Sequence, residues 1–157
     1  MEATALVTPP FYPKHISAGT VLYRVSPVGD YRFLIMYRRK SGTWHLPKGT
    51  QRPEETLEET AMRETQDETG MTPKLEEFLG TVESTFERSG EPIQKETHYY
   101  LARLADEFSR IPDNEHDIRV FVHFHEADRF LREGTIYEEE WGVLEEAYAR
   151  LLEREEK

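Results

Sequence analysis

The chain lacks three things that would each point to a particular class of protein. It has no cysteine, which excludes disulfides, thiolate nucleophiles and zinc sites ligated by cysteine. No apolar run approaches the ~20 residues that a membrane-spanning helix needs, so we expect no membrane partner. The opening residues lack a basic stretch followed by an apolar one, so no signal peptide is expected and a cytoplasmic location is predicted. A chain already separated from a leader would read the same way.

Positive charge is scarce in the chain as a whole but not at its beginning. The net charge is −11, which argues against general nucleic-acid binding. Residues 1–52, however, contain eight basic and two acidic residues, so the acidic excess falls entirely on the rest of the chain. A basic N-terminal third suggests a local site for an anion, and scattered solvated charges are the alternative. The sequence leaves both open, because it does not show whether the cations converge.

The stretch from Gly49 to Met71 is the most informative in the chain. It predicts a helix that begins near Pro53 and ends at Gly70, because proline suits a first helical turn and glycine the position just past the end. Glu64, Asp67 and Glu68 are spaced three and four residues apart, which places all three carboxylates on one face. Like charges so close together are tolerable around a cation. Ligation by oxygen alone favours Mg²⁺, with Mn²⁺ as a substitute.

The remaining segments predict a mixed sheet with helices on both faces, in a single domain over residues 16–157 that follows an irregular lead-in over residues 1–15. Strands are expected over residues 15–25, 31–39, 75–86 (one or two strands, broken at Gly80), 96–104 and 118–124. Residues 87–95 are expected to form a polar loop, and short and long helices are expected over 126–132 and 137–155. The long helix has an apolar stripe that predicts one buried face: Tyr137, Trp141, Leu144, Tyr148, Leu151 and Leu152.

The central stretch resembles the Nudix hydrolase box, which reads G, five residues, E, seven residues, R-E-U-x-E-E-x-G-U, where U is aliphatic. Here Gly49 is followed after five residues by Glu55, and after seven more by the segment 63–71, RETQDETGM. Two positions depart from the box: Thr65 replaces an aliphatic residue and Asp67 replaces a glutamate. An acidic solvated helix face is the alternative, but it would not also supply Gly49 and Gly70 in register.

The resemblance implies an α/β/α sandwich and hydrolysis of a phosphoric anhydride with Mg²⁺. By that resemblance, Glu64 and Glu68 are the principal metal ligands and either could be the general base. Asp67 is a further ligand, one methylene shorter, which is expected to bind the metal less directly or through water. The remaining implied roles are a backbone carbonyl ligand from Gly49, an orienting ion pair between Arg63 and Glu55, and another glutamate from a later loop, for which Glu96 and Glu115 are the candidates.

The box specifies the bond that is cleaved and not the rest of the small-molecule polyphosphate substrate. The approach WHLPKG (44–49) resembles that of family members acting on dinucleoside polyphosphates and on diphosphoinositol polyphosphates, and QKETHYY (94–100) resembles a basic strand of the latter branch. The candidate phosphate-binding residues are Arg24, Arg38, Arg39, Lys40, Lys48, Arg52, Lys95 and His98.

A diphosphoinositol polyphosphate is the first expectation for the substrate and a dinucleoside polyphosphate the second. ADP-ribose and an mRNA cap are less favoured substrates. A polyphosphate-binding module without catalysis is a further, less favoured alternative. A site that recognises a nucleotide would need aromatic rings to stack on the base. Those available are better explained by core packing: Tyr23, Tyr37, Phe86, Tyr99 and Tyr100. The sequence leaves the oligomeric state open.

Overall fold

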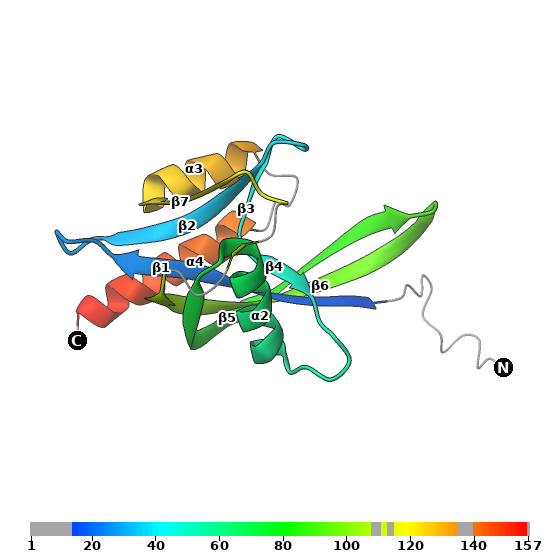
Figure 1. Cartoon of the computed structure of the whole chain (residues 1–157), viewed down its shortest axis with the longest axis horizontal. Helices are drawn as coiled ribbons and strands as arrows, with labels where there is room; N and C mark the ends of the chain where they lie inside the picture. Colours follow the sequence, from blue (N-terminus) through cyan, green and yellow to red (C-terminus); the bar gives the residue numbers. More distant parts are fainter. Residues whose placement is uncertain (1–13, 108–110, 113–114, 135–139, 157) are drawn as a thin grey trace.

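The computed structural model describes residues 14–107, 111–112, 115–134 and 140–156 (Figure 1). Its elements run along the chain in the order β1 (Lys14–Val25), β2 (Tyr31–Arg38), β3 (Thr43–His45), β4 (Lys48–Thr50), α2 (Leu57–Thr69), β5 (Thr72–Arg88), β6 (Glu91–Asp106), β7 (Ile118–His123), α3 (Phe124–Gly134) and α4 (Glu140–Glu155). None of the helices in this part of the chain has the length and apolarity that a membrane crossing requires.

The strands form one mixed sheet, as the sequence predicts. The order across the sheet is β3-β2-β1-β6-β5, with β7 paired to β2 and β4 paired to β1. β1 and β6 run parallel, whereas the other pairs are antiparallel. Pairing with β4 along its first half and with β2 along its second places β1 at the centre of the sheet.

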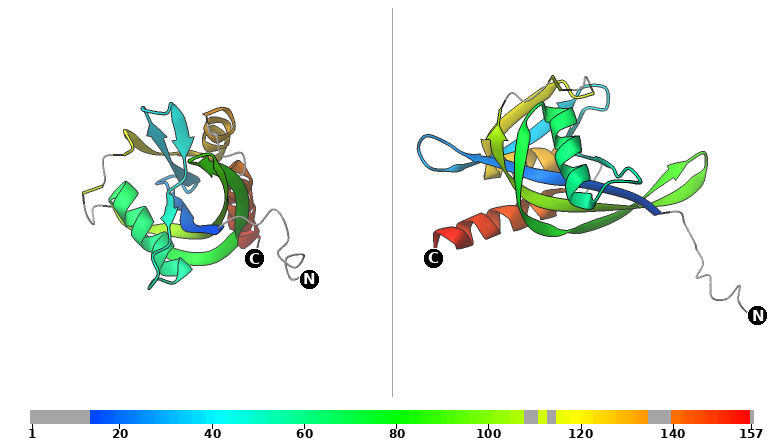
Figure 2. Two further views of the ribbon diagram at one scale, coloured as in Figure 1. Left: turned by 90° about the vertical axis from the view of Figure 1, so that its right-hand side faces the viewer. Right: turned by 60° about the horizontal axis from the view of Figure 1, so that its bottom comes forward.

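Helices cover both faces of the sheet, so the predicted layered arrangement is confirmed (Figure 2). Alternation along β1 divides its side chains between them: Val21 packs in the cluster with α3 and α4, while Ala18 packs against α2. Leu144 and Leu151 of the predicted stripe on α4 are buried. Trp141 and Tyr148 pack against the same core. Leu152 is 39% exposed, and Tyr137 lies outside the described residues.

The loop predicted over residues 87–95 is wrong, because β5 and β6 form one long hairpin. The ladder continues to the pair Arg88–Glu91, and only Ser89 and Gly90 form the turn. Both have positive φ, 53° and 81°, as a tight turn matched to strand twist requires. The break expected at Gly80 is a register irregularity within a continuous strand. The far end of this hairpin projects beyond the helices (Figure 1).

The start of α2 also differs from the prediction. Pro53 lies in a turn before the helix, and Thr56 is the N-cap. Thr56 and Glu59 form a reciprocal capping box that satisfies two backbone N–H groups, which is why the helix begins there. The predicted end is correct, since Gly70 caps the helix with φ of 75°.

Candidate functional site

The carboxylate of Glu64 lies directly against the backbone of Gly49. Gly49 is paired with Ala18 of β1, so this position of β4 faces α2. A Cβ added to Gly49 would be 2.1 Å from the carboxyl carbon of Glu64, so only glycine allows this approach. Burial raises the pKa of Glu64, and the Arg63 guanidinium partly opposes that shift.

Arg63 joins the loop before α2 to the acidic face of the helix. Its Nη2 donates to Oε1 of Glu55 at 2.9 Å and to the carbonyl of Thr50 at 2.9 Å. Its Nε donates to the other oxygen of Glu55, and its Nη1 to Glu64 at 2.7 Å. These bonds hold the pKa of Glu55 down to about 2, mainly through the Arg63 side chain. The structure therefore contains the ion pair that the motif predicts, and extends it to Glu64.

Glu68 is more enclosed than the other two carboxylates of the helix. It is 9% exposed and its Oε1 accepts the N–H of Lys48 at 3.2 Å. Arg119 of β7 donates to its backbone carbonyl. The Asp67 side chain is 35% exposed and lies 3.5 Å from Nη1 of Arg63, so it lies at the solvent-exposed rim of the acidic face.

The donor set fits a hard divalent cation. Glu64 and Glu68 supply carboxylate oxygens one helical turn apart, and the Gly49 carbonyl group belongs to the backbone against which Glu64 packs. Among the described residues, no three acidic or histidine side chains converge closely enough to form a metal cluster by themselves. Two helix carboxylates and a backbone carbonyl would suit Mg²⁺, which is usually bound by one or two carboxylates and keeps several waters.

Two adjoining hollows extend from Glu68 toward the turn between β2 and β3. The inner one, of about 150 Å³, is lined by Arg38, His45, Leu46, Lys48, Glu68, Glu115 and His116. The outer one, of about 480 Å³, is lined by Arg38, Arg39, Lys40, Glu115 and Asp117. Arg38 and Glu115 line both, so the two hollows lie next to each other.

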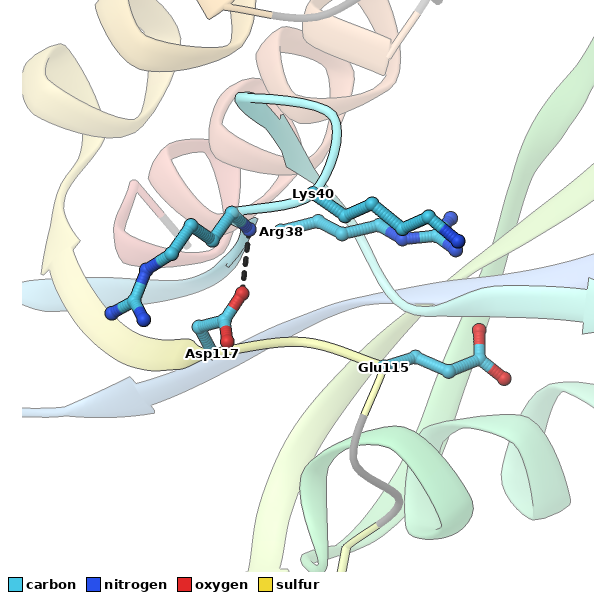
Figure 3. Close-up of a pocket in the computed structure, with 5 residues that line it drawn as sticks. Arg38, Lys40, Glu115 and Asp117 are labelled. Carbon is cyan, nitrogen blue, oxygen red and sulfur yellow. Dashed lines mark hydrogen bonds between the residues drawn. The ribbon is translucent and has the colours of Figure 1, made fainter.

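Two of the cations that line the outer hollow point the same way. The side chains of Arg38 and Lys40 run side by side in the direction in which Glu115 also points (Figure 3). Asp117 instead accepts the backbone N–H of Arg39 at 2.5 Å, which fixes the turn. Glu96, the other glutamate considered from later segments, pairs with Lys14 at 3.1 Å and with His98 at 2.6 Å. Glu115 is thus the candidate that shares a hollow with Glu68.

The other predicted phosphate-binding residues are dispersed. Arg24 lies over the ring of Phe121 at 4.8 Å and lines neither hollow. Arg52 is exposed in the loop before α2, where its charge acts on Glu64.

Lys95 and His98 are separated by the sheet. Their odd spacing along β6 places them on opposite faces. Lys95 shares a small cavity with Lys48, whereas His98 bonds to Glu96 and Thr81. Burial and the charge of Lys48 lower the pKa of Lys95 to about 8.

Sequence reasoning did not single out four residues that the fold brings to this site: His45, His116, Arg119 and Glu140. His45 and His116 line the inner hollow, with ring centroids 6.0 Å apart. Burial, followed by the charge of Lys48, lowers the pKa of His45 to about 3, so its ring is neutral. The one available signal was the position of His45 within the WHLPKG approach.

Comparison with known proteins identifies the family. A sequence model of the NUDIX domain matches residues 13–147, which is most of the chain. The chain belongs to the NUDIX family. Nudix hydrolase 21, chloroplastic, of Arabidopsis thaliana is 32% identical over 112 residues, covering 69% of this chain and 56% of that protein. Nudix hydrolase 4 of the same plant is 33% identical over 94 residues, covering 60% and 44%. The chain thus spans about half the length of these relatives.

Solved structures share the fold over nearly the whole chain. The crystal structure of a C. elegans Ap4A hydrolase binary complex superposes with a TM-score of 0.70 at 26% identity, covering 88% of this NUDIX chain and 98% of that one. The NUDIX domain of Shewanella oneidensis NrtR, solved with ADP ribose, superposes with a TM-score of 0.69 at 21% identity, covering 96% and 99%. At that identity the second likeness shows the fold alone.

Proposed function

We propose that this NUDIX domain hydrolyses phosphoric anhydride bonds with Mg²⁺, and that diphosphoinositol polyphosphates are its first substrate class. The observation that carries the proposal is a group of cations in the hollows next to Glu68: Lys48 and Arg38 line the inner hollow with it, and Arg38 and Lys40 line the outer one. A substrate dense in phosphate needs several cations beyond the metal, because each phosphate brings charge that must be neutralised.

Each residue of the acidic face has a role in this reaction. Bound Mg²⁺ would neutralise phosphate oxygens and make a water nucleophilic. Glu64, Glu68 and the Gly49 carbonyl would hold it, with Asp67 acting from the rim through water. Arg63 and Glu55 hold Glu64 in place, and the raised pKa of Glu64 is suited to accepting a proton. Glu115 is the candidate for a further carboxylate on the opposite side of the hollow.

The packing of the aromatic residues supports a substrate without a stacked base. Tyr23 and Tyr99 are 2% and 1% exposed, and Tyr100 is buried as well. Tyr37 packs on Trp44 with ring centroids 5.0 Å apart. Phe86 of the hairpin contacts His15 of β1, with ring centroids 5.8 Å apart.

A dinucleoside polyphosphate is the second candidate, and one specific observation favours it. The C. elegans Ap4A hydrolase complex covers almost the whole fold at 26% identity. A dinucleotide would lay its phosphate chain along the same cations. Its bases would then need Phe86, Phe78, which is 48% exposed, or a ring now committed to packing.

Phosphate release with Mg²⁺ tests the proposal on a panel of diphosphoinositol pentakisphosphate, diadenosine polyphosphates, ADP-ribose and capped RNA, at equal concentrations and two salt levels. Preference for the inositol compound, weakening steeply with salt, is expected, because screening acts on exposed cations. Preference for a dinucleotide with little salt dependence would favour the second candidate. Binding of a polyphosphate without any cleavage would leave a binding module.

A further inference from the structure

The short connection between β3 and β4 carries Lys48 and Gly49 into the site, and it is held unusually tightly by β1. A Cβ added to Gly19 would lie 2.1 Å from the carbonyl oxygen of Pro47 and 2.7 Å from Cβ of Lys48. Thr20 donates its backbone N–H to the same carbonyl at 3.0 Å. The connection therefore has almost no room to move toward β1.

Two carboxylates from helices on opposite faces of the sheet hold the two ends of this connection. Glu140, the first residue of α4, accepts the backbone N–H of Leu46 at 3.2 Å. Glu68 of α2 accepts the backbone N–H of Lys48 at 3.2 Å. Only Pro47, which has no N–H, lies between these two donors.

Glu140 is buried far more deeply than a surface helix normally buries its first residue. It is 1% exposed, and the oxygen that accepts from Leu46 also accepts the hydroxyl of Tyr99 at 3.2 Å. Its other oxygen is 3.8 Å from Nδ1 of His45, and Lys48 and Lys95 line the same small cavity. Burying a carboxylate is costly unless it is hydrogen-bonded and compensated by charge, and these contacts provide both.

We propose that Glu140 is a positioning residue: by fixing the backbone at Leu46 it sets the Gly49 carbonyl and the Glu68 carboxylate in the geometry that binds a divalent cation. The role of Glu140 rests on the proposed function only in taking Gly49, Glu64 and Glu68 as the cation site. It requires no contact between Glu140 and the metal or the substrate.

Mn²⁺ binding to the free protein, measured by electron paramagnetic resonance, tests this role without any substrate. Glu140→Ala and Glu140→Asp both withdraw the acceptor from Leu46 and are expected to weaken Mn²⁺ binding at least fivefold. Glu140→Gln keeps an oxygen of the same reach and is expected to bind Mn²⁺ within twofold of wild type. Hydrogen exchange of the Leu46 amide should follow the same order, with at least tenfold lower protection in the alanine and aspartate variants.

Glu153→Ala is the matched control, because Glu153 is an exposed glutamate on the same helix. It should leave Mn²⁺ binding and Leu46 exchange unchanged. Glu140→Asp and Glu140→Gln also separate position from charge, and they keep the test decisive if the alanine variant does not fold. The role of Glu140 is overturned if Glu140→Asp and Glu140→Gln lose Mn²⁺ affinity equally, or if Glu140→Asp binds Mn²⁺ as the wild type does.

Hydrolysis is judged separately from the role of Glu140. A wild-type chain that binds Mn²⁺ and cleaves nothing on the panel overturns the proposed function and leaves the role of Glu140 to the binding result. A wild-type chain without affinity for Mn²⁺ overturns both.

Discussion

The two sides of the site are built in different ways. On the acidic side, Glu55, Arg63 and Glu64 form a half-buried network of hydrogen bonds anchored to a capped helix. On the basic side, Arg39 and Lys40 extend from a turn into solvent, with Arg38 half-buried between them and Glu68. The proposed chemistry would therefore lie on a hydrogen-bonded, half-buried element, and the proposed phosphate recognition on more exposed side chains.

This difference matches what the proposed function would require of each side. Transition-state stabilisation depends on groups held in position before the reaction, so small displacements of Glu64 or Glu68 are costly. Attraction of a polyanion is long-ranged and tolerates several arrangements of a lysine or arginine side chain. Changes on the acidic side should thus alter the rate steeply, and changes on the basic side should alter affinity gradually.

Neutralising either of the two carboxylates proposed to bind the metal should have the largest effect on the acidic side. Glu64→Gln and Glu68→Gln keep the shape and remove the charge, and loss of the metal's contribution is expected to lower kcat about 10³-fold or more. Steady-state phosphate release with Mg²⁺ measures this loss. If hydrolysis survives either change, the assignment of these carboxylates is wrong.

Gly49→Ala tests whether the rigidity of this side matters as much as its charge. The added methyl group would be 2.1 Å from the carboxyl carbon of Glu64, so either the strand or the carboxylate must shift. We expect kcat to fall about 100-fold with all charges retained, since a misplacement of roughly 1 Å can cost that much. Gly142→Ala is the matched control, because a Cβ there meets nothing within 4 Å. Equal activity of the two variants would contradict a tight fit at Gly49.

The acidic side could be read from the sequence because it is encoded locally. The carboxylates, the glycine at the end of the helix and the arginine lie within 22 residues of Gly49, and helical spacing alone brings the three carboxylates to one face. Pro53 predicts a start that is too early, because the helix begins after Thr56, where Thr56 and Glu59 form a capping box.

The rest of the site could not be read from the sequence because it depends on tertiary contacts. Glu140 reaches Leu46 across 94 positions of the chain, and no local pattern predicts that contact. The candidate cations looked equivalent in the sequence, yet Arg38 lines the site and Arg24 lies over Phe121. Residues 87–95 are polar, so their sequence resembles a loop. Cross-strand pairing nevertheless holds them in strands on either side of the turn at Ser89 and Gly90.

Removing cations from the basic side should give a smaller effect, expressed in affinity. The double variant Arg38→Ala/Lys40→Ala is expected to raise KM about tenfold with kcat nearly unchanged, because these charges attract the substrate before reaction. The salt dependence of kcat/KM should weaken in parallel. Arg24→Ala, which removes a cation that lines neither hollow, should leave KM within twofold. A similar rise in KM for Arg24→Ala would return that residue to the substrate site.

The smallest effect concerns His45, which lies between the two sides and lines the inner hollow with Arg38 and Glu68. Its pKa is lowered from 6.5 to about 3 in the folded state, so the unfolded chain binds the proton first as the pH falls. Keeping the His45 ring neutral therefore costs no unfolding free energy above about pH 6.5, and the free energy of unfolding decreases as the pH falls from 6.5 toward 3. Between pH 6.5 and 5.5 the loss should be about 1 kcal/mol of unfolding free energy.

Urea unfolding of the metal-free protein at those two pH values measures this loss. His45→Gln removes the titrating ring and should flatten the dependence by that amount, whereas His125→Gln, a change at an exposed histidine, should keep the wild-type slope. An unchanged slope in His45→Gln would mean that the imidazole takes up a proton while folded. The inner hollow would then gain a positive charge beside Lys48 at mildly acidic pH. The positively charged part of the site would then include the His45 ring, close to Glu68.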